Sequence, residues 1–140
     1  MSSSAVDYRH PAVEAVAAIG AGLDELADSS LWSMPVAELG GLVVALERLG
    51  RRLCAAQIEA LAQADASQVA RSTGATSTAA WLRNVADVPP WACKSRLALH
   101  RSLVNRPVTA AAFSAGDISV DAAAAVCSAI DALPGGSRRR

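Results

Sequence analysis

Residues 39–53 read LGGLVVALERLGRRL, and this stretch decides the fold. Its leucines recur at alternating steps of three and four residues, and alanines continue the pattern: Leu39, Leu42, Leu46, Leu49, Leu53, Ala56 and Ala60. Such spacing places apolar side chains on one side of an α-helix. The pattern predicts one long helix over about residues 36–68, with Leu46, Leu49 and Leu53 buried in the core.

Start and stop signals predict shorter helices on both sides of this segment. Pro11 suits the first turn of a helix, Ser77 and Ser119 are suitable N-caps, and Gly116 follows a helix as a C′ glycine. Alanine, the best intrinsic helix former, supplies 32 of the 140 residues. The sequence therefore predicts an all-α bundle of about six helices organised along the long helix. We expect a disordered N-terminus over residues 1–10, a helical domain over 11–134 and a flexible basic tail over 135–140.

Several single residues carry expectations about packing. A glycine inside a helix costs about 1 kcal/mol relative to alanine, so Gly40, Gly41 and Gly50 predict points of close helix approach. Large aromatic side chains in an alanine-rich chain are typical core anchors, which applies to Trp32, Trp81 and Trp91. His100 shares a helix face with Cys93 and Leu97, so we expect it to be packed.

The net charge is zero, but the charges are unevenly distributed. Residues 1–38 hold six acidic residues and one basic residue, whereas Val88–Gly116 holds four basic residues and no acidic one. These four are candidate contacts to the phosphates of nucleic acid: Lys94, Arg96, Arg101 and Arg106. A solvated helix face explains the same residues without a partner, and both interpretations stay open.

The chemistry-bearing residues form no recognisable catalytic or metal-binding motif. His10 and His100 have no ligand or base partner at a useful spacing, and Cys54, Cys93 and Cys127 are far apart in sequence. We therefore expect no catalytic residue, no metal site and no cofactor in this chain. No apolar run is long enough to span a bilayer and no signal peptide is recognisable, so we expect a cytoplasmic protein with no membrane partner.

Two predicted helix pairs have the spacing of helix-turn-helix units. Residues 110–128 combine a glycine turn with a serine cap, but the second helix lacks side chains suited to reading base edges. A packed helical corner explains the same residues, and we favour it over a DNA-reading unit. The pair over Thr78–Val104 carries the basic residues, although its turn is long and has no glycine.

Several short motifs, taken together, resemble a known bacterial family. They are Leu46–Leu53, Gly74, Ser77 with Ala80-Trp81-Leu82-Arg83, Leu103 with Pro107, Ala115-Gly116-Asp117-Ile118-Ser119, and Leu133-Pro134. Over roughly residues 36–134 the chain is similar to the bacterial domain of unknown function 222, found in the 13E12 repeat family.

The resemblance implies a helical region that commonly precedes an HNH endonuclease module. The histidines and metal ligands of such a module have no counterparts here, so none of the family's catalytic residues can be assigned. We expect the chain to be a truncated family member, and a homo-oligomer or the partner of a missing C-terminal region. The predicted function is a non-catalytic helical domain for DNA engagement or assembly. The alternative is a dimerisation module with no DNA role.

Overall fold

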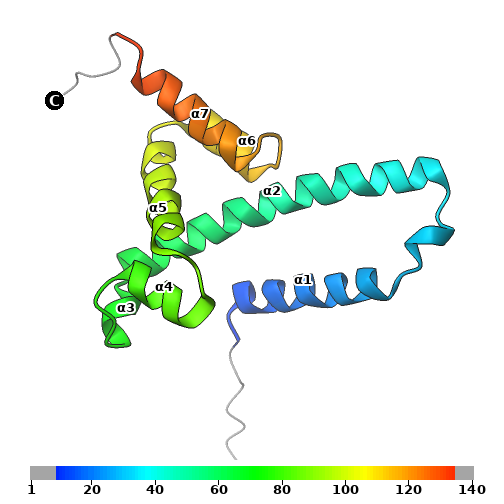
Figure 1. The fold of residues 1–140 in the computed structure, drawn as a ribbon, viewed down its shortest axis with the longest axis horizontal. Helices are drawn as coiled ribbons and strands as arrows, with labels where there is room; N and C mark the ends of the chain where they lie inside the picture. The colour runs from blue at the N-terminus through cyan, green and yellow to red at the C-terminus, as the bar shows by residue number, and fades with distance from the viewer. Residues whose placement is uncertain (1–8, 135–140) are drawn as a thin grey trace, which may run out of the picture. The chain divides into compact units, whose positions relative to one another are not determined.

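The computed structural model describes residues 9–134 (Figure 1). These residues form seven α-helices and one short 3-10 helix, with no strand, which confirms the all-α prediction. The elements are α1 (Pro11–Asp28), η1 (Leu31–Ser33), α2 (Val36–Ala66), α3 (Val69–Ser72), α4 (Thr78–Ala86), α5 (Pro90–Val104), α6 (Pro107–Ser114) and α7 (Val120–Asp131). The prediction missed the single turn of α3 and the 3-10 helix η1. The basic tail over 135–140 and most of the predicted disordered segment over 1–10 lie outside the described residues.

Local capping chemistry sets the helix ends. The hydroxyls of Ser77 and Ser119 accept hydrogen bonds from the backbone N–H groups of Ala80 and Ala122, at 3.0 and 3.1 Å, as expected of N-caps. Pro11 occupies the first turn of α1, where its missing N–H leaves no helix hydrogen bond unmade. These local interactions explain why the boundaries were readable in the sequence.

The described residues fall into two compact units, whose boundary in the sequence lies between Gly41 and Leu42. In the first unit, α1 has no buried residue, and its apolar side chains Val13, Val16, Ile19 and Leu23 are about half exposed or more. In the second unit, α5 packs against α4, α6 and α7, and α6 lies beside α7 (Figure 1). No helix among the described residues is long and apolar enough to cross a membrane.

The core of the second unit is small and rich in short side chains. Its buried members come from the later part of α2 and from α5, α6 and α7: Ala55, Ile58, Leu99, Leu103, Phe113, Ala123 and Cys127. Ile58 is only 2% exposed, so the side of α2 that carries it is the side that faces the core. The helices can approach closely because alanine and cysteine occupy positions where bulkier side chains would separate them.

The prediction that the leucine stripe is the core was wrong. Leu46, Leu49 and Leu53 are 37%, 52% and 42% exposed. At 100° per residue, Leu49 lies nine residues and therefore about 180° from Ile58 around the helix axis. The helix thus has two apolar sides, and the more regular one is not the side that the second unit buries.

Two other packing predictions were also wrong. Trp32 and Trp91 are 89% and 73% exposed, and of the three tryptophans only Trp81 is partly buried. A Cβ atom added to Gly40, Gly41 or Gly50 would meet nothing within 4 Å, so these glycines mark no close contact within the chain.

Among the glycines within residues 9–134, the one close approach occurs in the turn between α6 and α7. Gly116 has φ +80°, in the left-handed region, and a Cβ built on it would lie 2.6 Å from the carbonyl oxygen of Arg48 in α2. Beside it, the guanidinium of Arg48 and the carboxylate of Asp117 form an ion pair of 2.7 Å. The turn therefore packs directly on the backbone of α2.

Gly116 should be far less replaceable than Gly74, which has the same φ of +80° but open space around it. Gly74→Ala introduces only the left-handed strain, about 1–2 kcal/mol. Gly116→Ala adds an overlap with α2 and should destabilise by about 2 kcal/mol more. Urea unfolding of both variants measures the difference, and equal losses would show that the turn does not pack on α2.

Candidate interaction surfaces

The basic residues of α5 do not form one continuous patch. Lys94 and Arg101 are exposed and lie seven residues apart, which puts them on the same side of the helix and about 10 Å apart along its axis. Arg96 is partly buried and lies on another side of α5, about 200° around the axis from Lys94. Among residues 9–134, neither Lys94 nor Arg101 has an ion-pair partner. These two cations form the exposed basic face of α5.

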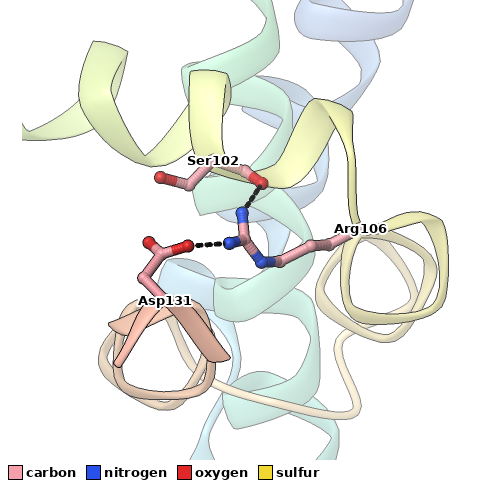
Figure 2. Close-up of polar contacts among 3 residues, drawn as sticks. All are labelled: Ser102, Arg106 and Asp131. Carbon is pink, nitrogen blue, oxygen red and sulfur yellow. Dashed lines mark hydrogen bonds and ion pairs between the residues drawn. The ribbon is translucent and has the colours of Figure 1, made fainter. Parts of the chain in front are cut away.

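Arg106 has a different environment from the other three basic residues (Figure 2). One terminal nitrogen of its guanidinium donates a 2.5 Å hydrogen bond to the backbone carbonyl of Ser102, and the other donates to the carboxylate of Asp131. The side chain is only 17% exposed, and its buried Nε atom has no hydrogen-bond partner. Arg106 therefore joins the C-terminal end of α5 to the last turn of α7.

An open groove runs beside this contact. It encloses about 670 Å³, and its lining residues are Ala98, Arg101, Ser102, Asn105, Arg106, Ile130 and Asp131. Asp131 offsets the charge of Arg106, so Arg101 is the uncompensated cation of the groove. Sequence reasoning had placed Arg101 and Arg106 together without Asp131, because no local pattern connects residues 25 positions apart.

His100 and Cys93 lie on the buried side of α5. The Nε2 atom of His100 is 3.1 Å from a carboxylate oxygen of Glu59, which links α5 to α2. Burial, and secondarily the negative charge of Asp65, raises the pKa of the Cys93 thiol, while Arg96 and Lys94 act in the opposite direction. A fully buried neutral thiol is a packing group rather than a nucleophile. Among residues 9–134, no three His, Cys, Asp or Glu side chains lie together at metal-binding distance.

The second surface is the leucine face of α2, defined here as Leu42, Leu46, Leu49 and Leu53. All four side chains lie about 120–180° around the helix axis from Ile58, so they point away from the core of the second unit. Val43, which is 54% exposed, lies beside this face at about 90° around the axis, whereas Val44, which is 70% exposed, lies on the opposite side of α2, about 40° from Ile58. Four regularly spaced leucines on the outside of a helix form a continuous apolar strip of the kind that proteins use to contact other proteins.

Comparison with protein-family models, with curated proteins and with solved structures found no match for this chain. The resemblance to the domain of unknown function 222 is therefore still a prediction from the sequence motifs.

The environment of Arg106 predicts a structural role that Arg101 does not share. Arg106→Ala removes two hydrogen bonds of a charged group and leaves Asp131 unpaired, so we expect a loss of stability of about 1–3 kcal/mol. Arg101→Ala, which removes the same charge from an exposed position, should change stability by less than about 0.5 kcal/mol. Chemical denaturation separates the two, and a neutral Arg106 variant would contradict the link between α5 and α7.

Proposed function

We propose that this chain is a helical assembly module that associates with a second copy of itself through the leucine face of α2. The observation that carries this proposal is the exposure of Leu46, Leu49 and Leu53 on the side of α2 opposite Ile58. By the motif resemblance, the module would belong to a family associated with HNH nucleases, and pairing would bring two copies of any attached module together.

The arrangement of apolar residues supports assembly more strongly than their number does. Exposed apolar side chains scattered singly over a surface need no explanation. Here they recur along one line of one helix, at the spacing by which α-helices pack against each other in coiled coils. The leucine line does not form the core of the second unit. The core side chains that α2 supplies are Ala55 and Ile58, which lie on the other side of the helix.

Self-association should be concentration-dependent and should depend on the leucine face. A Leu46→Lys/Leu49→Lys double variant places two charges in the contact and should lower the dimer fraction at least tenfold at a fixed concentration. A Val126→Lys/Ile130→Lys variant is the matched control, because these residues of α7 are 40% and 39% exposed. Light scattering over a concentration series measures the mass. A wild-type chain that stays monomeric throughout would contradict the proposal.

A second candidate function is binding to the phosphate backbone of DNA through Lys94 and Arg101. It rests on their exposure, their shared side of α5 and their lack of ion-pair partners within residues 9–134. Two lysine or arginine contacts to phosphate give weak binding that depends on salt and carries little sequence information.

This second function predicts a measurable salt dependence. Each phosphate contact contributes about 0.9 to the slope of log affinity against log salt, so Lys94→Gln/Arg101→Gln should reduce the slope by about two units. Arg71→Gln/Arg83→Gln removes the same charge from exposed positions of α3 and α4 and is the control. A slope that both variants reduce equally would indicate general charge attraction and not contact through α5.

A further inference from the structure

We infer that the exposed side of α5 binds single-stranded nucleic acid, with an unpaired base stacked on the indole of Trp91 and phosphates of the same strand held by Lys94 and Arg101. This inference rests on the second proposed function, the contact of Lys94 and Arg101 with phosphates. It adds the form of nucleic acid that is bound and the side chain that holds a base. All three residues belong to the second unit.

Trp91 is the feature of this surface that phosphate contacts alone leave unexplained. Its side chain is 73% exposed, although α5 buries Leu99 and Leu103 in the core. One exposed apolar side chain needs no explanation by itself. An exposed indole beside two cations is different, because aromatic rings and positive charges are the two elements with which proteins bind single strands.

The indole and the two cations lie on one side of the helix. At 100° and 1.5 Å per residue, Lys94 and Arg101 are about 60° and 80° around the axis from Trp91, in the same direction, and about 4.5 and 15 Å along it. Leu103, which is buried, is about 120–180° around the axis from all three. The ring and both charges therefore face away from the core together, and a strand extended along α5 can meet them in succession.

The groove beside Arg106 continues this surface. The side of α5 that carries Trp91 also supplies more than half of its lining residues: Ala98, Arg101, Ser102 and Asn105. The groove encloses about 670 Å³, within the range of about 300–1,000 Å³ that is typical of ligand sites. The amide of Asn105 can donate hydrogen bonds to a phosphate or to the edge of a base. A strand that runs from Trp91 along α5 therefore reaches a concave and polar path.

The exposed indole favours a single strand over a duplex. In a duplex each base is stacked between its neighbours, so a ring on the surface of a protein helix cannot reach a base face except at an end. A single strand presents its base faces, and stacking on an aromatic side chain tolerates any base because every base has a π-face.

The same surface matches a membrane poorly. A helix that lies on a bilayer turns its apolar side toward the lipid. The apolar side of α5 is already in the core, through Leu99 and Leu103. Trp91 is the one large apolar side chain on the exposed side of this helix. The arrangement of charge and ring therefore favours nucleic acid over a lipid surface.

Fluorescence anisotropy with a labelled oligothymidylate tests the inference in the full-length chain. A strand of about 12 nucleotides is within the site sizes of known single-strand binders. Because one stacked base is lost, Trp91→Ala should weaken binding at least about fivefold. Trp32→Ala is the matched control: Trp32 is 89% exposed and lies in η1, so its replacement should leave the affinity unchanged.

Salt dependence separates stacking from charge. Trp91→Ala removes no charge, so it should weaken binding without changing the slope of log affinity against log salt. Lys94→Gln/Arg101→Gln should reduce that slope by about 1.4, since each phosphate contact of a single strand contributes about 0.7. A change of slope in Trp91→Ala would contradict a stacking role.

An abasic strand of the same length and charge tests the base contact directly. It presents no ring, so Trp91→Ala should have no effect on its binding. With oligothymidylate, Trp91→Phe should retain most of the affinity and Trp91→Leu should not, because leucine is apolar but has no ring on which a base can stack. Circular dichroism and the thermal midpoint check that each variant is folded.

The outcomes separate this inference from the function on which it rests. If Trp91→Ala binds oligothymidylate like the wild type while Lys94→Gln/Arg101→Gln still reduces the slope, the stacking role is overturned and phosphate contact is retained. If neither variant has an effect, both proposals are overturned. Tighter binding to a duplex of the same sequence would overturn the preference for a single strand. Trp91-dependent binding to phosphatidylserine vesicles, without binding to oligothymidylate, would assign the surface to a membrane and overturn both.

Discussion

The contact of Ile58 and Ala55 of α2 with Leu99, Leu103 and Phe113 is the interaction on which the rest of the second unit depends. It fixes which side of α2 is inside, because a helix can turn only one side toward a given neighbour. Once Ile58 is buried, the geometry of the helix turns the leucine face outward. The surface proposed for assembly is therefore a direct consequence of how the core is built.

The sequence predicted the helices better than it predicted their burial, and the reason is physical. Helix ends depend on groups within a few residues of each other, as at Ser77 and Gly116, and these can be read along the chain. Burial depends on partners that are distant in sequence. Since α2 is apolar on two sides, the regular leucine pattern and the less regular side with Ile58 competed as core candidates, and periodicity alone favoured the wrong one.

The candidate basic site divides for a similar reason. The sequence grouped Lys94, Arg96, Arg101 and Arg106 by their sign, because no acidic residue lies among them. The fold separates them by environment: Asp131 arrives from α7 and pairs with Arg106, whereas Lys94 and Arg101 stay in solvent. Because the charge of Arg106 is already paired with Asp131 inside the fold, fewer cations are available to contact a nucleic acid than the sequence suggests.

The small core also connects assembly to stability. A core of seven buried residues, three of which are alanine or cysteine, buries little apolar area, and small domains of this kind have little stability in reserve. A second copy that binds the folded chain and not the unfolded one shifts the folding equilibrium toward the native state by mass action. If the leucine face pairs, the apolar area missing from the core is supplied between chains. The two apolar sides of α2 would then serve one purpose: Ile58 holds the second unit together, and the leucines stabilise it further when two chains meet.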